Sequence, residues 1–219
     1  MKRKQTDIQD FGYTKKMITS TPNKDKKISE KKDALSLSSH KVVYARDEDP
    51  ADTLVIRSFY PDAPEGLRRF GMKGVDNIKK LLLAILKLLD EVEMNEVIAH
   101  TKFLTATQVF SLYDLVDEFK EEIEEMGFDS FQKTTGSGTE FTYVTIPNTN
   151  VRVGITITKK NPQICLFQDV GPDCITGIFL FMMEIHKLIK YMNTKFQYTE
   201  HRSFLNTYRS MDDSKDNFF

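Results

Sequence analysis

The stretch that decides the fold runs from Glu140 to Val170 and reads "EFTYVTIPNTNVRVGITITKKNPQICLFQDV". It holds three runs of alternating residue types, at 140–146, 151–158 and 163–170. A period of two is typical of β-strands, and connections as short as "PNTN" and "KKNP" can join only antiparallel neighbours. The stretch therefore predicts an antiparallel β-meander.

The meander has two different faces, because side chains alternate along a strand. One face is aliphatic, and we expect it to pack against helices; its members are Val144, Ile146, Val151, Val153, Ile155, Ile157, Ile164 and Leu166. The other face combines rings with a cation, hydroxyls and an amide; its members are Phe141, Tyr143, Thr145, Arg152, Gly154, Thr156, Thr158, Gln163, Cys165 and Phe167.

The segments around the meander favour helices. Apolar residues recur at steps of three and four from about Asp76, at Ile78, Leu81, Leu82, Ile85, Leu88, Leu89 and Val92. A second helix opens with a Thr105/Gln108 capping box and stops at Gly127. A third follows "GPD", with Ile175, Ile178, Met182, Ile185, Ile189 and Met192 on one stripe. With a single strand at "DTLVIRSFY" (52–60), these elements predict an α+β fold in which the antiparallel meander packs on helices.

Composition divides the chain into three parts. Residues 1–50 are rich in Lys, Asp, Ser and Thr and lack a sustained apolar period, which predicts a disordered basic arm. Residues 51–196 form the single α+β domain, and 197–219 a flexible acidic tail that ends in Phe218 and Phe219. The formal net charge of −1 conceals +6 in residues 1–41 and −7 in the remainder, so a body that coats duplex nucleic acid by charge alone is disfavoured.

Several classes of function lack support in the sequence. Cys165 and Cys174 give neither a disulfide framework nor a metal spacing with the four histidines, so we expect no metal site and a reducing, intracellular compartment. No apolar signal region and no run long enough to span a bilayer occurs, which predicts no membrane association. No Gly-rich phosphate loop or paired nucleophile is present, so the sequence supports neither an enzyme nor a cofactor.

The mixed face of the meander favours binding of single-stranded nucleic acid. Aromatic rings can stack unpaired bases, while nearby Arg and Lys hold the phosphates without sequence preference. The site residues we expect are Phe141, Tyr143 and Phe167 for the bases, with Arg152, Lys159 and Lys160 for the backbone. Half-exposed antiparallel sheets also carry Tyr, Thr and Phe outward, and the strand and loops before Gly71 could cover this face instead.

The C-terminus "MDDSKDNFF" places Asp212, Asp213 and Asp216 before a terminal aromatic. This arrangement resembles the tips of bacterial and viral single-stranded-DNA-binding replication proteins, although Lys215 interrupts the acidic run. The resemblance implies that Phe218 and Phe219 dock partner enzymes or that the tail competes with DNA for a basic groove.

The N-terminal "QTDIQDF" resembles the peptide with which replication proteins bind the sliding clamp. Gln5, Ile8 and Phe11 match its spacing of three, which one turn of 3₁₀ helix requires, and lysines and an arginine flank them. Gly12 stands where that family has a second aromatic residue. A basic tail or nuclear-import patch is the other interpretation of this segment.

The meander followed by a helix, over residues 140–193, also resembles the single-stranded-DNA-binding domain of the positive-cofactor-four coactivators in the order of its elements. That resemblance implies a dimer. Together these patterns predict a non-catalytic protein of replication or transcription, intracellular and at a nuclear or viral replication site, that binds single-stranded nucleic acid. The alternative is an adaptor or self-assembling subunit, whose dimer surface would use Phe179, Leu180, Phe181 and Met183 of the final helix.

Overall fold

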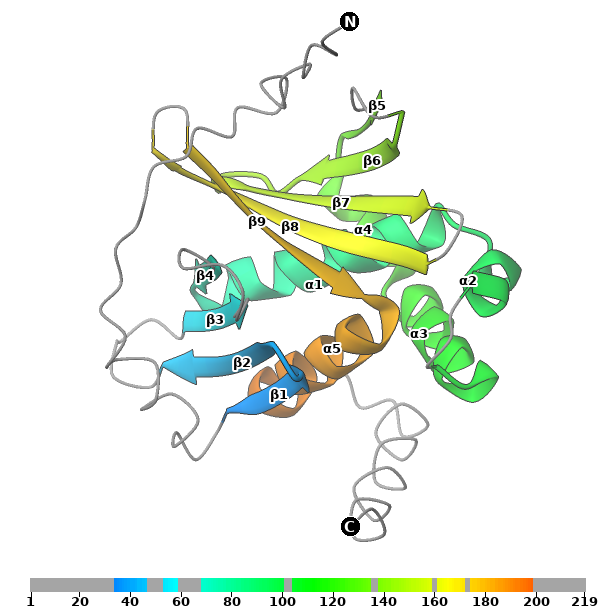
Figure 1. Ribbon diagram of the computed structural model, residues 1–219, viewed down its shortest axis with the longest axis horizontal. Coiled ribbons are helices and arrows are strands. Elements are labelled where there is room, and N and C mark those ends of the chain that lie inside the picture. The colour runs from blue at the N-terminus through cyan, green and yellow to red at the C-terminus, as the bar shows by residue number, and fades with distance from the viewer. Residues whose placement is uncertain are drawn as a thin grey trace, which may run out of the picture.

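The structure, a computed structural model, describes residues 34–46, 53–58, 68–100, 104–134, 138–158, 161–171 and 174–198. These residues form two antiparallel sheets, of four and five strands, and five helices (Figure 1). The α+β class predicted from the sequence is confirmed. Within the described residues, none of the helices has both the length and the apolar content that crossing a bilayer requires.

Three of the four strands in the first sheet were not predicted from the sequence. Its strands are β1 (Leu35–Ser38), β2 (Lys41–Arg46), β3 (Thr53–Ser58) and β4 (Arg68–Lys73), paired in that order. The prediction of a disordered arm is therefore wrong for residues 34–46, and the strand expected at 52–60 is one of four. The short strands alternate a few apolar residues, such as Leu37 and Val43, with polar ones, so composition alone conceals them.

The second sheet contains the predicted meander. It comprises β5 (Ser130–Thr134), β6 (Glu140–Thr145), β7 (Val151–Thr158), β8 (Asn161–Gly171) and β9 (Cys174–Phe181), again in chain order. The three predicted strands are confirmed as β6, β7 and β8, and one further strand is added at each edge. The described aliphatic side chains of the predicted inner face are buried in the main core: Val144, Ile146, Val151, Val153, Ile155, Ile164 and Leu166.

The final helix begins later than the sequence predicts. Ile175 and Ile178 belong to β9, and α5 spans Met182–Phe196. A short apolar run such as "ITGIFLF" suits a buried strand and a buried helix equally, so periodicity could not separate them. Tyr198, assigned to the tail, stacks on Phe196 and donates a hydrogen bond to the carbonyl of Val75 (2.7 Å).

The other helices lie between the two sheets in the chain. They are α1 (Val75–Asp90), α2 (Met94–His100), α3 (Ala106–Glu118) and α4 (Lys120–Met126). The Thr105/Gln108 capping box is confirmed, and Gly127 ends α4 with a left-handed φ of 55°. The single helix predicted from 105 to 126 is divided at Phe119, and α2 was not predicted.

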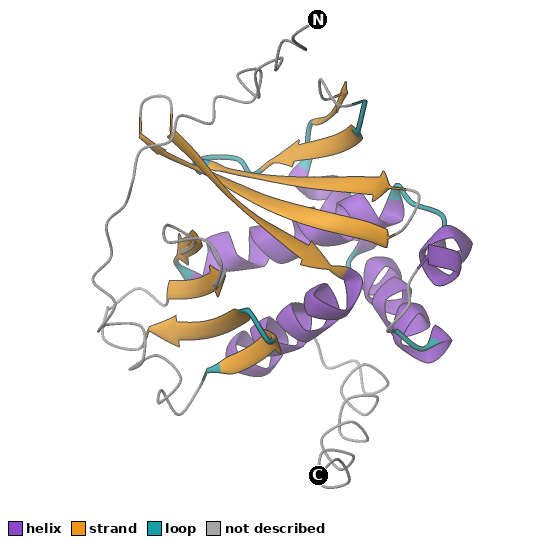
Figure 2. Cartoon of the chain, viewed as in Figure 1, coloured by secondary structure: helices purple, strands orange, loops and turns teal. Residues whose placement is uncertain are grey.

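The chain repeats one pattern twice, a sheet followed by a long helix, and the two helices lie against both sheets (Figure 2). The first helix, α1, contacts β4 of its own sheet but also β6 and β7 of the second sheet. In turn α5 contacts β8 and β9 and also β1 and β2 of the first sheet. Each long helix therefore closes the core under both sheets.

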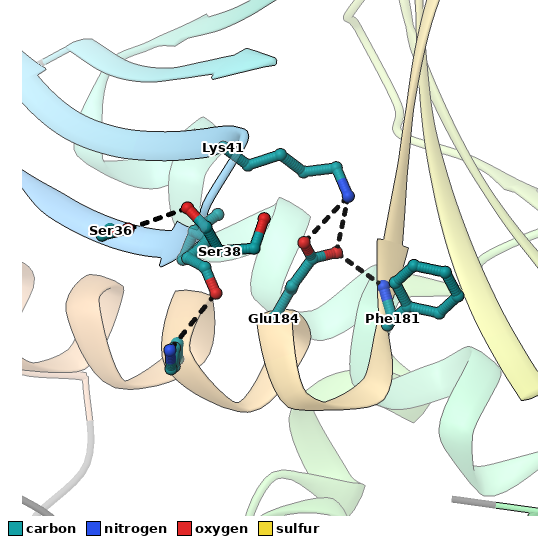
Figure 3. Close-up of polar contacts among 7 residues, drawn as sticks. Ser36, Ser38, Lys41, Phe181 and Glu184 are labelled. Carbon is teal, nitrogen blue, oxygen red and sulfur yellow. Dashed lines mark hydrogen bonds and ion pairs between the residues drawn. The ribbon is translucent and has the colours of Figure 1, made fainter. Parts of the chain in front are cut away.

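A buried ion pair joins α5 to the first sheet (Figure 3). The ammonium Nζ of Lys41 donates to both carboxylate oxygens of Glu184 at 2.8 Å, with the two side chains only 9% and 2% exposed. Glu184 Oε2 also accepts from the backbone N–H of Phe181 (2.9 Å), the residue before α5. About two turns further along α5, the Tyr191 hydroxyl accepts from the N–H of Ala45 in β2 (2.7 Å).

A side-chain amide joins the edge strand β4 of the first sheet to β8 of the second sheet. Gln168 of β8 donates to the carbonyl of Gly71 in β4 (2.8 Å) and accepts from its N–H (3.2 Å). The amide thus satisfies an edge strand as a neighbouring peptide would. This contact places β4 beside the second sheet, where it also contacts β9.

We predict that the Lys41–Glu184 pair is costly to break on one side. Glu184→Ala should lower the free energy of unfolding by about 3–5 kcal/mol, since it leaves a buried ammonium without a counter-charge. The double variant Lys41→Met/Glu184→Leu should lose much less, because no buried charge remains. Urea denaturation of both variants measures this, and equal losses would contradict the interpretation.

Candidate nucleic-acid interface

The outer face of the second sheet carries a row of residues that crosses all five strands. The strand register pairs Phe131 with Tyr143, Tyr143 with Gly154, Gly154 with Cys165 and Cys165 with Phe179. Three rings and a thiol therefore point the same way across β5 to β9, on the side opposite the helices.

The rings on this face contact one another. The ring centroid of Tyr143 lies 5.4 Å from that of Phe131, 5.5 Å from Phe141 and 5.7 Å from Phe167. Phe167 in turn meets Phe179 edge-on at 6.1 Å. These separations fall within the range in which aromatic pairs attract each other. We call these five rings the ring cluster.

Gly154 lets the Tyr143 ring lie against the strand. A Cβ atom at this position would come within 2.7 Å of both Cδ1 and Cε1 of Tyr143 and 3.6 Å of Cε2 of Phe167. Any side chain larger than hydrogen would displace the ring. The glycine in "VRVGITIT" is therefore part of the cluster.

The cluster is less exposed than the sequence predicted. The structure brings Phe141, Tyr143 and Phe167 together on one face, but leaves them only 8%, 5% and 7% exposed, so the expectation that they present open rings to solvent is wrong. The rings contact one another, and the Tyr143 ring lies over Gly154. The accessible ring is Phe131 of β5, which is 43% exposed.

Arg152 lies at one end of the cluster, directly across from Phe167 in the register. Its Nη2 lies 3.1 Å from Oδ1 of Asp169, and the two side chains are 35% and 50% exposed. Exposed ion pairs contribute at most about 1 kcal/mol, so an incoming phosphate can compete for this guanidinium. Lys133 of β5, opposite Phe141, adds an exposed cation at the other end.

Three residues of this face were not predicted from the sequence: Phe131, Lys133 and Phe179. Phe131 and Lys133 alternate on one face of a five-residue strand that is exposed throughout, which is too short a signal to separate from a loop. Phe179 was assigned to the final helix instead of β9. Lys159 and Lys160 lie outside the described residues, as do the terminal-motif residues Gln5, Ile8, Phe11, Phe218 and Phe219.

The Cys165 thiol on this face is buried. Burial raises the pKa of the Cys165 thiol well above its usual range, so the reactive thiolate is suppressed. Away from the face, burial, Lys190 and Lys187 lower the pKa of His186 to about 4. Within the described ranges, no three His, Cys, Asp or Glu side chains converge as metal ligands.

Comparison of the chain with family models, curated proteins and solved structures finds no match. The interpretation of this face therefore depends on its own geometry and chemistry. Those are a cross-strand ring cluster, one accessible ring at the edge strand, and a cation at each end.

We predict that Gly154→Ala opens the cluster, because the new methyl group must displace the Tyr143 ring. In a Cys174→Ser background, Cys165 should resist Ellman's reagent even at pH 9, since a raised pKa keeps the thiol protonated. Adding Gly154→Ala should make it react at least about tenfold faster, because the ring that shields it has moved.

The matched control is Gly71→Ala in the same background. A Cβ at Gly71 meets no atom within 4 Å, so this change should leave Cys165 unreactive. Equal protection of Cys165 in both variants would show that the ring of Tyr143 does not depend on the glycine.

Proposed function

We propose that the protein binds single-stranded nucleic acid at the outer face of its second sheet. The observation that carries the proposal is the ring cluster with Phe131 as its accessible edge and with Lys133 and Arg152 beside it. Base stacking on an aromatic ring contributes about 1–3 kcal/mol per base and tolerates any base. Unpaired strands expose those base faces, whereas a duplex does not.

The rings have different roles in this proposal. Phe131 offers a face to a base, while Phe141, Tyr143 and Phe167 form the floor that holds it in position. Arg152 and Lys133 contact phosphates at the two ends of the cluster. The net charge of −7 outside residues 1–41 favours such local contacts over general attraction to a polyanion.

The order of elements in the second half of the chain supports the same proposal. A run of antiparallel strands followed by the helix α5 suits the resemblance to the positive-cofactor-four domain. We further propose that the terminal motifs recruit partners, Gln5, Ile8 and Phe11 a sliding clamp and Phe218 and Phe219 other replication proteins, in an intracellular homo-oligomer at a nuclear or viral replication site.

A second candidate function is that of an adaptor, favoured by the edge strand β5. All five of its residues are exposed, and exposed edge strands can pair with a strand from another chain. The prediction that Phe179, Leu180 and Phe181 form a dimer surface on the final helix is wrong. These three residues belong to β9, and Leu180 is fully buried.

We predict that Phe131→Ala weakens binding of a fluorescein-labelled oligothymidine by about 5- to 100-fold at low salt, because a stacking ring is lost. Phe110→Ala is the matched control, since Phe110 on α3 is equally exposed (47%) but lies on a helix. It should change the affinity less than twofold. Fluorescence anisotropy measures both, and a wild-type protein that fails to bind at low salt would overturn the proposal.

A further inference from the structure

We infer that a polar groove between β4 and the β6–β7 turn binds the sugar–phosphate backbone of a single strand as that strand leaves the ring cluster. The groove has a volume of about 640 Å³ and lies at the junction of the two sheets. The inference rests on the proposed function and extends it from the second sheet to the first. It assigns ligand contacts to Arg69, Lys73 and Asn148, which lie outside the predicted site.

The walls of the groove are rich in amides. Asn77 at the start of α1 and Gln168 of β8 line it, together with Asn148, Thr149 and Asn150 of the turn. Amide groups can donate to phosphate oxygens and accept from sugar hydroxyls without selecting a base. The chemistry of these walls therefore suits a nucleic-acid backbone better than an apolar ligand.

The groove is held in shape by contacts of its own residues. Asn77 donates to the carbonyl of Lys73 (3.0 Å), and Thr149 donates to the carbonyl of Ile146 (2.9 Å). Gln168 holds β4 in place through Gly71. Because these bonds hold β4 to α1 and to β8 and fix the turn internally, the groove is a preformed feature and needs little ordering when a ligand binds.

Cations extend from the groove along the outer face of β4. Lys73 lines the groove and is exposed, and Arg69, four residues earlier on the same face of β4, is also exposed. Arg57 of β3 lies opposite Arg69 in the register, with its guanidinium 5.9 Å from the centroid of the Tyr44 ring. Between Arg69 and Lys73 stands Gly71, beside which a Cβ would meet open space. A backbone could thus approach the strand closely between two cations.

Among the described residues, Asp76 and Asp169 are next in sequence to the groove residues Asn77 and Gln168. Asp76 in the first turn of α1 is exposed, and Asp169 on β8 is engaged by Arg152. The same region carries three basic side chains, Arg57 of β3 and Arg69 and Lys73 of β4. Charge complementarity therefore favours a polyanion along this path.

The groove is continuous in sequence with the ring cluster. Val151 lines the groove, and the next residue, Arg152, lies on the outer face across from Phe167. Because neighbouring residues of a β-strand point to opposite faces, a bound strand would leave the outer face at Arg152, pass around the β6–β7 turn and reach Lys73 and Arg69. This path links the outer faces of both sheets.

The test is the salt dependence of oligothymidine binding, measured by fluorescence anisotropy with an oligomer long enough to cover both faces. Each phosphate contact contributes about 0.7 to the slope of log K against log salt for single strands, so Arg69→Ala/Lys73→Ala should lower that slope by about 1.4. Lys87→Ala/Lys120→Ala removes the same charge from the depression between α1 and α4 and should leave the slope unchanged.

A second pair of variants probes the groove without removing a cation. Asn148 has a left-handed φ of 60°, which Asp tolerates, so Asn148→Asp should fold normally and weaken binding at least about threefold by repelling phosphate. Asn148→Gly suits the same backbone and removes the amide without adding charge, so it should weaken binding less than Asn148→Asp does.

The outcomes separate the two proposals. Wild-type binding that depends on Phe131 but is unaffected by Arg69→Ala/Lys73→Ala and by Asn148→Asp would overturn the groove and leave the ring cluster as the whole site. Absence of wild-type binding at low salt would overturn both. A reduced slope together with sensitivity to Asn148→Asp supports the path across the two sheets.

Discussion

Glu184 lies in the first turn of α5 with its carboxylate buried against the ammonium of Lys41, and neither charge could be buried alone without a large desolvation cost. The pair fixes where α5 begins relative to β2, and Tyr191 secures the next turns of the helix to Ala45. The helix α1 contacts strands of both sheets, as α5 does, so both helices pack in the core that the two sheets share. The outer faces of the sheets are the surfaces that this arrangement leaves without helices.

Those outer faces carry the chemistry that we assign to ligand binding. On the second sheet, Gly154 allows Tyr143 to lie flat, and the neighbouring rings close over the strand. On the first sheet, β4 presents Arg69 and Lys73, and Gln168 connects β4 to the second sheet. A ring cluster and a basic strand are thus held in fixed relation by the core contacts described above. This pre-organisation lowers the ordering cost of binding a flexible strand.

The sequence predicted the elements whose signals are long or chemically distinct. The stripe from Ile78 to Val92, the Thr105/Gln108 box and the three alternating strands are of this kind, and all are confirmed. It failed where signals are short or ambiguous, as in β1, β2 and β5, and in β9, which is apolar on both faces. The alternation placed Phe141, Tyr143 and Phe167 on the correct face, but their burial depends on neighbours across strands that periodicity does not reveal. The positions of Phe131 and Lys73 beside the proposed site follow only from the pairing of β5 and β4 with their neighbouring strands.

Photo-crosslinking tests the central claim most directly. A single-stranded oligonucleotide carrying 5-iodo-2′-deoxyuridine is bound, irradiated, and mapped by mass spectrometry of the digested protein. Base stacking on Phe131 predicts crosslinks to the peptide that contains this residue, because a base must lie on that ring to react with it. Crosslinks confined to the peptides of α3 and α4, or their complete absence from β5, would contradict it.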